Sequence, residues 1–318
     1  MNLSILIIGK NTEKTLEKCI SSIFDAIQNT KYIDSCDIIY IDSNSSDSSV
    51  DIAKAKKVET IEMIDGFTTA SLGRYLGLKH SNHNNILFID GDMELDLDWF
   101  DNSFDYYSQY GAIHGERYEK IYNNDVVIKE IPKFFGMEQA EVAKNIGGCF
   151  MVNMKNLKGI NFSPILKDEE ERDFYAKFLD KQLIYRIPVP MFIHNNYNLT
   201  TSRLKSYLLP YNKIGYLLSF FYSVKNGYFA NYFKLQNKFL ISAIASLFFY
   251  YFMISGAFVL IIIPIILLRL INKEYYKGAL ASMIFFPYKL VTSIIYLKKD
   301  FKCSYRYRNL NYTLSGAL

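Results

Sequence analysis

The chain has 318 residues and a formal net charge of +4, enough length for one domain of ordinary size and a substantial further segment. Charge is divided sharply along it: residues 1–200 contain 21 Lys and Arg against 30 Asp and Glu, whereas residues 201–318 contain 15 against 2. The four scattered cysteines include no CxxC pair, which argues against a disulfide framework or a cysteine zinc site and agrees with a reducing cytosol. The opening MNLSILIIGKN lacks the basic start and long apolar stretch of a secretory signal.

Strand and helix patterns alternate through the first 95 residues. Short apolar runs predict strands, and apolar residues at helical spacing predict helices. In chain order the expected elements are a strand over 3–8, a helix over 12–26, a strand over 37–41, a helix over 46–55, a strand over 58–64, a helix over 71–79 and a strand over 86–89. This alternation predicts a parallel α/β sheet with helices on both faces, in which ligands bind outside the carboxyl ends of the strands.

Polar turns follow each of the four predicted strands. Any one of them could merely cap the next helix. Four turns at one edge of a sheet instead predict a binding site there. The turns are Gly9-Lys10-Asn11, Asp42-Ser43-Asn44, Asp65-Gly66 and Asp90-Gly91-Asp92.

Asp90 and Asp92 flank a glycine just past the fourth, fully apolar strand. Two carboxylates so close together repel each other unless a cation lies between them. Mg²⁺ and Mn²⁺ prefer oxygen ligands and often share them with substrate phosphates. The pair therefore predicts a divalent cation site, whereas the following acidic residues, Glu94, Asp96 and Asp98, are more typical of a solvated helix start.

A second acidic segment, KDEEERDFYAKFLDKQLIYRIPVPMFIHNN, covers residues 167–196. Five carboxylates within Asp168–Asp173 mark a helix start, with Phe174 and Phe178 as its buried stripe. A carboxylate near this start could face a cleft and act as a general base. Ile184–Val189 predicts a further strand, and the lone His194 after it is more often structural than a ligand.

The last third of the chain is apolar and basic. Phe239–Leu268 contains no charged residue, and Gly278–Leu297 contains only Lys289, whereas about 20 apolar residues suffice to cross a bilayer. We therefore expect transmembrane helices at about 239–271 and 278–297 within a region 239–318 that ends in a basic tail. Interfacial amphipathic linker helices are expected over 201–238. A tilted span, a kinked span and a re-entrant hairpin, broken at Ser255-Gly256 or Pro264, remain open.

Residues 3–196 resemble a family-2 glycosyltransferase with a GT-A fold. SILIIGKNTEKTLEKCISSI is similar to the opening strand and helix of that family, with Asn11 and Glu13 at its Asn-Glu pair and Gly9 where proline is usual. IIYIDSNSSDSSVDIAK resembles its Val-Asp-x-x-Ser-x-Asp segment through Asp42 and Asp47.

Three further motifs extend the resemblance. LGRYLGLKHS resembles the Ala-Arg-Asn-x-Gly segment through Arg74 and Gly77, with Tyr75 replacing the usual Asn. Asp90-Gly91-Asp92 resembles the metal motif, and EERDFYAKF resembles the Glu-Asp-x-Asp-Leu-x-x-Arg signature. The resemblance implies a GT-A type nucleotide-binding, Rossmann-like catalytic domain over 1–200, followed by the helical membrane region.

The resemblance also implies residue roles. Glu171 is placed as the catalytic base, with Glu170 as the alternative, because the signature leaves the register between them open. The remaining roles are donor binding by Asn11, Glu13, Asp42, Asn44, Arg74 and Asp90, acceptor-side contacts by Gly147, Gly148 and Asp173, and metal binding by Asp90, Asp92 and His194, with Mg²⁺ or Mn²⁺ as cofactor.

The expected partners are a UDP-, GDP- or dTDP-linked sugar donor, a lipid-linked or other saccharide acceptor, and the lipid bilayer, with no nucleic acid. We expect inverting transfer at the cell (inner) membrane, with the catalytic domain facing the cytoplasm, in glycan or polysaccharide biosynthesis. The alternatives are a polyprenyl-phosphate glycosyltransferase, a non-catalytic membrane protein that binds sugar nucleotides, and a nucleotidyltransferase. The last would need a more glycine-rich and basic loop than GKNTEK.

Overall fold

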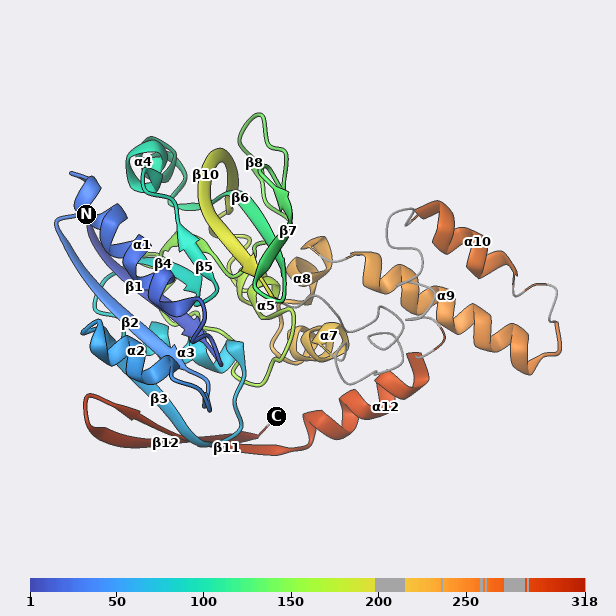
Figure 1. Ribbon diagram of the computed structural model, residues 1–318. Coiled ribbons are helices and arrows are strands. Elements are labelled where there is room, and N and C mark those ends of the chain that lie inside the picture. The colour runs from blue at the N-terminus through green and yellow to red at the C-terminus, as the bar shows by residue number, and fades with distance from the viewer. Residues whose placement is uncertain are drawn as a thin grey trace. The chain divides into compact units, whose positions relative to one another are not determined.

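The computed structural model of the chain describes residues 1–197, 215–235, 237–257, 260, 262–271, 284 and 286–317. The chain forms two compact units, one of Met1–Leu199 with Asp300–Ala317 and the other of Thr200–Lys299. In the first unit the strands join one mixed sheet in the order β12-β11-β3-β2-β1-β4-β9-β6-β10-β5, with β7 beside β6 and β8 beside β10. Figure 1 labels all of these strands except β9.

The alternating elements predicted for the first 95 residues are confirmed. β2, β1 and β4 pair in parallel, and β3 pairs in parallel with β2. Their bounds are β1 Asn2–Gly9, α1 Leu16–Asn29, β2 Ser35–Asp42, α2 Ser49–Ala55, β3 Glu59–Gly66, α3 Ala70–His80 and β4 Asn85–Asp90.

The core lies on both faces of this parallel sheet because successive side chains of a strand point to opposite faces. On one face Leu3, Ile5 and Ile7 of β1 pack with the apolar side of α1. On the other face α3 approaches the sheet closely at Gly77, where a Cβ would lie 3.2 Å from Leu6. Burial on both faces explains why β1 is a continuous apolar run rather than an alternating one.

Beyond β4 the sheet becomes mixed. β9 pairs antiparallel with β4 and β6, and β10 pairs in parallel with β6 but antiparallel with β5. Consequently β5 and β10 bring residues 93–95 and 192–194 alongside one another. The bounds are β5 Met93–Leu95, α4 Trp99–Tyr110, β6 Ala112–Asn123, β7 Val126–Ile131, β8 Glu141–Val142, β9 Phe150–Asn153, α5 Glu170–Ala176 and β10 Tyr185–Asn196.

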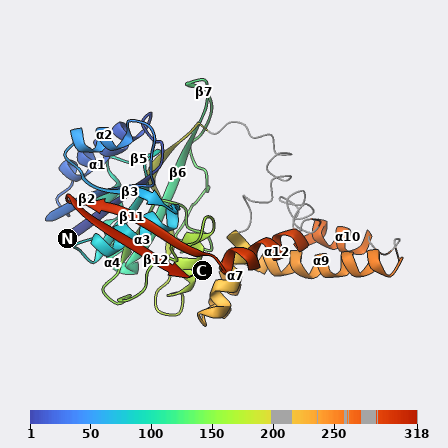
Figure 2. The ribbon, with the colours of Figure 1, turned by 90° about the horizontal axis from the view of Figure 1, so that it is seen from below.

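The C-terminal residues form a hairpin on the mixed sheet, where the sequence predicted a basic tail beyond a membrane span. β11 (Asp300–Tyr307) pairs antiparallel with both β12 (Leu310–Ala317) and β3. Figure 2 shows this red hairpin running along the edge of the sheet. Phe301, Cys303, Tyr305 and Tyr307 are buried on one side of β11, and this apolar face explains why the segment docks on the sheet. The first unit therefore extends beyond the predicted boundary at residue 200.

The second unit is helical in its described residues. The uncharged run 239–268 is divided between α9 and α10, so a break at Ser255-Gly256, one of the predicted possibilities, is present. Within the described part of the chain, no helix combines the length and apolar character needed to cross a bilayer, so the predicted transmembrane helices are not confirmed. Residues 201–214 and 272–283 of the predicted regions lie outside the described residues. The helices are α7 Gly215–Lys225, α8 Phe229–Leu235, α9 Asn237–Ile254, α10 Ile262–Ile271 and α12 Phe286–Leu297.

Candidate active site

The Asp90-Gly91-Asp92 turn lies at the carboxyl end of β4 and is fixed through its backbone. The Gly91 amide donates to the Ile8 carbonyl over 2.8 Å, and the Thr15 hydroxyl donates to the Gly91 carbonyl over 2.8 Å. The Asn195 amide of β10 donates to the Asp92 carbonyl over 2.9 Å. Three neighbouring elements therefore hold the turn, and its two carboxylates project from a rigid support.

Arg74 joins the carboxylates that the sequence placed in separate motifs. Its side chain is 1% exposed, and its Nη2 atom lies 2.7 Å from Asp90 Oδ1 and 3.3 Å from Glu171 Oε1. Its Nη1 atom donates to Glu170 Oε1 over 2.9 Å. One buried guanidinium thus holds the end of β4 and the start of α5 together, and its charge is shared by three carboxylates.

Burial and neighbouring charges shift the protonation of this cluster. Burial disfavours the charged form of Arg74, but its carboxylate partners outweigh this and raise the pKa of Arg74 above its ordinary value. Burial, followed by the charge of Glu171, raises the pKa of Glu170 to about 8 against the opposing effect of Arg74. Burial also raises the pKa of Asp90 to about 6, again opposed by Arg74. Glu170 is therefore mainly protonated at neutral pH.

A pocket opens at this edge of the sheet and brings together five of the predicted site residues: Arg74, Asp90, Asp92, Glu170 and Glu171. The rest of its lining comes from the end of β1, from the predicted polar turns after β1, β2 and β4, and from the segment that leads into α3. The sequence gives none of these residues an individual role: Ile8, Gly9, Lys10, Thr12, Ser43, Thr68, Thr69, Ala70 and Gly91.

Charge in the pocket is unbalanced. Its lining carries four carboxyl groups, of which Glu170 is mainly protonated, against two cationic groups, and Arg74 already contacts three of the four carboxyl groups. Lys10 is exposed and has no ion-pair partner among the described residues. The position of Lys10 in a polar turn after the first strand was the sequence signal that could have identified it.

The predicted donor-binding residues of the first two turns mainly hold each other. Asn11 Oδ1 accepts from the Ser46 amide over 2.9 Å, and Glu13 Oε2 accepts from the Ser48 amide over 3.2 Å. Asp42 is 2% exposed and accepts from the Ser45 amide over 2.8 Å and from Tyr40. Asn44 has a positive φ of 62° in the same loop. None of these four residues belongs to the pocket lining, although Ser43 beside them does.

The three predicted acceptor-side residues lie in different surroundings. Gly147 precedes β9 and has open space at its Cβ position, whereas a Cβ at Gly148 would overlap the Asp90 carboxylate. Asp173 is fully buried in α5, where it accepts from the Ser163 hydroxyl over 2.6 Å and lies 3.1 Å from Lys177. Gly148 thus borders the pocket through Asp90, while Asp173 anchors the helix that carries Glu170 and Glu171.

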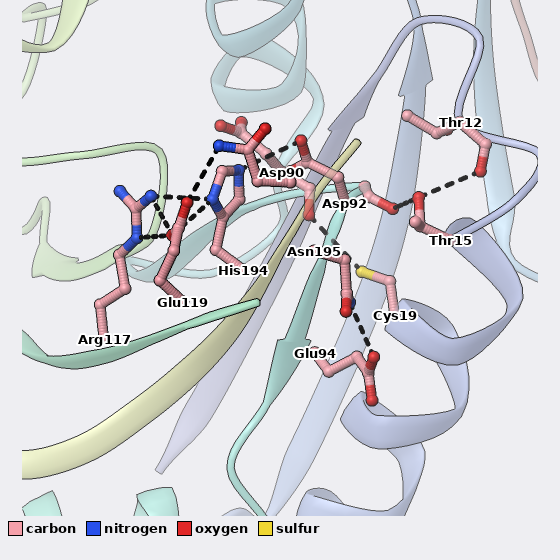
Figure 3. A network of polar contacts seen from close by, with 12 residues as sticks. Thr12, Thr15, Cys19, Asp90, Asp92, Glu94, Arg117, Glu119, His194 and Asn195 are labelled. Atoms are coloured by element: carbon pink, nitrogen blue, oxygen red, sulfur yellow. Dashed lines mark hydrogen bonds and ion pairs between the residues drawn. The ribbon is translucent and has the colours of Figure 1, made fainter. Parts of the chain in front are cut away.

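His194 lies beside the acidic turn, between strands β5 and β6. Its Nε2 atom is 3.4 Å from Asp92 Oδ2, and its Nδ1 atom is 2.9 Å from Glu119 Oε2. Figure 3 shows Arg117, Glu119 and His194 lined up toward Asp92. Burial disfavours the charged imidazole, but the Asp92 carboxylate outweighs it and raises the pKa of His194. Sequence reasoning missed Arg117 and Glu119, which lie in a strand with no motif around them.

The metal-binding prediction meets mixed observations. Among the described residues, no group of three or more His, Cys, Asp and Glu side chains is arranged to hold a metal ion by itself. Asp92 Oδ1, however, is buried and has no hydrogen-bond partner. A buried carboxylate oxygen without a partner is costly unless a ligand completes it.

The fold and the site define an α/β protein with a Rossmann-like sheet and an acidic pocket at its carboxyl edge. The profile of the family described as Glycosyl transferase family 2 matches residues 4–159, and together with the fold it supports a family-2 glycosyltransferase of the GT-A type. No protein of curated function matches the chain.

Solved structures with a similar fold include three of S. aureus TarS. The 1–349 fragment in complex with UDP-GlcNAc is 15% identical over 68% of this chain and 67% of that one, with a TM-score of 0.50. The same fragment with UDP is 14% identical over 98% of both chains, with a TM-score of 0.51. Without ligand it is 14% identical over 87% of this chain and 92% of that one, with a TM-score of 0.52. At these identities the likeness concerns the fold.

Proposed function

We propose that this protein is a metal-dependent, inverting glycosyltransferase that moves a sugar from a nucleotide-sugar donor to a saccharide acceptor. The observation that carries the proposal is the shared pocket: the acidic turn after β4 and the two glutamates at the start of α5 face the same space. A donor diphosphate at the turn would place its sugar toward the glutamates. The family match and the fold shared with a UDP-GlcNAc complex of TarS support a nucleotide sugar as donor.

The side chains present fit a divalent cation. Asp92 Oδ1 is buried without a partner, His194 Nε2 lies 3.4 Å from the other oxygen, Oδ2, and Asp90 is two residues away on the same turn. Mg²⁺ commonly uses one or two protein carboxylates and completes its shell with phosphate and water, so a preformed group of three ligands is not required. Held by Asp92, Asp90 and His194, Mg²⁺ or Mn²⁺ would supply Lewis-acid neutralisation of the diphosphate leaving group.

The charge of the pocket supports this cation requirement independently. An anionic diphosphate would enter a lining with three carboxylates besides the mainly protonated Glu170, and Arg74 already contacts Asp90, Glu170 and Glu171. Like charges at such distances repel strongly in a partly buried site. Lys10 is the exposed cation of the described lining, and we expect it to contact a phosphate oxygen. We propose that the nucleotide contacts the loop that follows the second strand. The side chains that hold this loop in place are Asn11, Glu13 and Asp42, and Asn44 is part of it.

Glu171 is the proposed general base. Its side chain is 18% exposed, against 8% for Glu170, and its contact with Arg74 is the longer one, at 3.3 Å. Glu170 Oε1 accepts from Arg74 Nη1, and burial keeps Glu170 mainly protonated at neutral pH, so it is poorly suited to accept a proton. Arg74 holds both glutamates at the pocket wall.

The chemistry follows from this arrangement. A Glu171 carboxylate oxygen takes the proton of an acceptor hydroxyl as that oxygen forms a bond to the anomeric carbon. The bond from the anomeric carbon to the diphosphate oxygen breaks with its electron pair, and the nucleoside diphosphate leaves. A single displacement of this kind inverts the anomeric centre. Its transition state resembles an oxocarbenium ion, as in sugar hydrolysis.

A lipid-linked acceptor at the cytoplasmic face of the cell membrane completes the proposal. Support comes from the second unit, where Leu247, Tyr251 and Ile254 of α9 are 64%, 65% and 87% exposed. Large apolar side chains in water favour contact with another apolar phase, and the basic residues of 201–318 favour anionic headgroups. A sugar nucleotide made in the cytoplasm would reach a catalytic unit on that side.

The test combines a donor panel with two substitutions. Thermal shifts with UDP-, GDP- and dTDP-sugars, each with and without Mn²⁺, identify the donor, and turnover of that donor is then measured. We expect Asp92→Asn to lose Mn²⁺-dependent turnover by at least about 100-fold, as for loss of a group that stabilises the leaving charge. Glu171→Gln should keep donor binding and lose transfer. Full turnover by Asp92→Asn would remove the metal role, and loss in Glu170→Gln alone would move the base to Glu170.

A further inference from the structure

His194 is held between two carboxylates that come from opposite neighbours of its strand. β10 pairs in parallel with β6, which places His194 opposite Glu119, and antiparallel with β5, which begins one residue after Asp92. The imidazole therefore has Glu119 at Nδ1, 2.9 Å away, and Asp92 at Nε2, 3.4 Å away. Figure 3 shows this sequence of side chains from Arg117 to Asp92.

Glu119 is a buried carboxylate with a complete set of partners. Its side chain is 3% exposed. Oε2 accepts from Arg117 Nε over 2.5 Å and contacts His194, and Oε1 accepts from Asn196 Nδ2 over 3.0 Å. A carboxylate held from three sides has one orientation, so it can fix the orientation of the ring that it touches.

The Nδ1 atom of His194 has two neighbours that require different protonation states. Glu119 can only accept, so its bond needs a proton on Nδ1, whereas Arg117 Nη2, 2.8 Å from Nδ1, can only donate and needs a lone pair there. The guanidinium of Arg117 already pairs with Glu119 through Nε and Nη2. Arg117 keeps this pairing with Glu119 whichever ring nitrogen of His194 carries the proton. Glu119 Oε2, 2.9 Å from Nδ1, is attracted to the ring only when a proton lies between the two atoms, and this charged acceptor is the contact on which the inference is based.

We propose that Glu119 is a positioning residue that keeps the proton of neutral His194 on Nδ1, so that Nε2 presents its lone pair to a divalent cation held by Asp92. The inference rests on the proposed function, because that function supplies the cation. A carboxylate on the far nitrogen of a metal-binding imidazole fixes the tautomer and increases the basicity of the ligand. Arg117 and Asn196 hold the carboxylate in place.

Metal affinity tests this role without any turnover measurement. Mn²⁺ is titrated into the full chain, alone and with excess UDP, and free Mn²⁺ is followed by its electron paramagnetic resonance signal. We expect Glu119→Gln to weaken Mn²⁺ binding by about 10–100-fold, the usual effect of removing such a partner. Glu130→Gln is the matched control, because Glu130 is an exposed carboxylate on neighbouring β7 and its change of charge is the same. It should bind Mn²⁺ like the wild type.

Two outcomes separate this inference from the proposed function. Equal Mn²⁺ affinity of the wild type and Glu119→Gln overturns the role of Glu119 and leaves the proposed function intact, whereas absence of Mn²⁺ binding by the wild type overturns both. If Glu119→Gln fails to fold, the position of the proton on His194 in the wild type tests the role of Glu119 instead. The chain has four histidines, and ¹⁵N-histidine spectra of the metal-free protein at alkaline pH, assigned with His194→Gln, should show a proton on Nδ1 of His194. A proton on Nε2 overturns the proposal.

Discussion

Gly148 and Asp90 show how a single residue determines the geometry of the pocket. Asp90 accepts from Arg74 Nη2 over 2.7 Å, and its carboxylate occupies the space in which a side chain at position 148 would lie. β9, which begins two residues after Gly148, pairs with the strand that carries Asp90, so the two backbones cannot separate to make room. Glycine is therefore required at position 148 by the close approach of the carboxylate.

Gly148→Ala should displace the Asp90 carboxylate from Arg74. A methyl group inserted into such a packed site typically costs about 1–3 kcal/mol. We expect a loss of that size in the free energy of unfolding, measured by urea denaturation. Metal-dependent turnover of the donor should fall by at least about tenfold, because the turn that carries Asp92 moves with Asp90.

The neighbouring glycine supplies the control. Gly147→Ala adds the same methyl group one residue away, where nothing lies within 4 Å of the added Cβ. It should change stability by no more than about 0.5 kcal/mol, as for a surface substitution. If the two variants behave alike, the contact between Gly148 and Asp90 has no role in the site.

The predictability of individual residues from sequence depends on how local their signal is. Asp90 and Asp92 could be predicted as pocket residues because an apolar strand ends directly before them. The partnership of Arg74 with Glu170 could not, since 96 residues separate them and each has an ordinary helical context. No sequence pattern marks Glu119, which is one acidic residue in a strand. Its role follows from its pairing with His194, which only the structure gives.

At the scale of elements, the hairpin of β11 and β12 extends the sheet beyond β3 with residues 300–317. β11 pairs with β3 at Gly66, and the Phe67 amide donates to the Lys302 carbonyl over 3.0 Å. The next residues, Thr68 to Ala70, line the pocket. The hairpin therefore covers the edge of β3 and fixes the segment that leads from β3 into the pocket wall.

Gly66→Ala should release this hairpin. Gly66 has φ of +87°, and a Cβ there would overlap the Lys302 carbonyl, so the variant suffers both backbone strain and a clash with main-chain atoms. We expect a loss of about 1–3 kcal/mol in the free energy of unfolding beyond that of the control. Amide hydrogen exchange of residues 301–307 should also become faster, because β11 loses its pairing with β3 and keeps only its pairing with β12.

Gly136→Ala is the control for backbone strain alone. Gly136 has a similar φ of +65°, but nothing lies within 4 Å of the added Cβ. The difference between the two variants isolates the clash with Lys302. Equal stability and equal exchange at 301–307 would mean that β11 does not depend on its contact at Gly66.

Periodicity predicted the first seven elements because each is specified by its own residues. The same kind of signal exists in β11, where Phe301, Cys303, Tyr305 and Tyr307 alternate with polar residues. The cationic side chains of this segment, Lys302, Arg306 and Arg308, favoured a basic tail instead. Its partner β3 is more than 200 residues away in the chain, and the local sequence of either strand does not indicate which strand it pairs with. Hydropathy likewise reported the apolar composition of 239–268 but not the end of α9 at Ile254.

At the scale of the whole molecule, the helical unit is an insertion between two strands of one sheet. β10 precedes it and β11 follows it, and both belong to the first unit. The charge division of the sequence follows the same plan, since residues 200–299 carry 12 Lys and Arg and only one acidic residue. An insertion of this kind adds a surface of its own, while the chain on either side of it continues into strands of the same sheet.

Binding to lipid vesicles tests the role of that surface. The full chain should float with vesicles that contain anionic lipid, and less so at high salt, because basic residues near a charged surface contribute about 1 kcal/mol each. Leu247→Asp with Ile254→Asp should weaken binding at least about tenfold, since each side chain contributes about 1.5–3 kcal/mol when it leaves water. The control is Val126→Asp with Ile128→Asp on β7, where the side chains are similarly exposed. Equal flotation of the wild type and the double variant Leu247→Asp with Ile254→Asp would mean that α9 does not contact lipid. Equal loss in both variants would mean that added negative charge, rather than the apolar face of α9, controls binding.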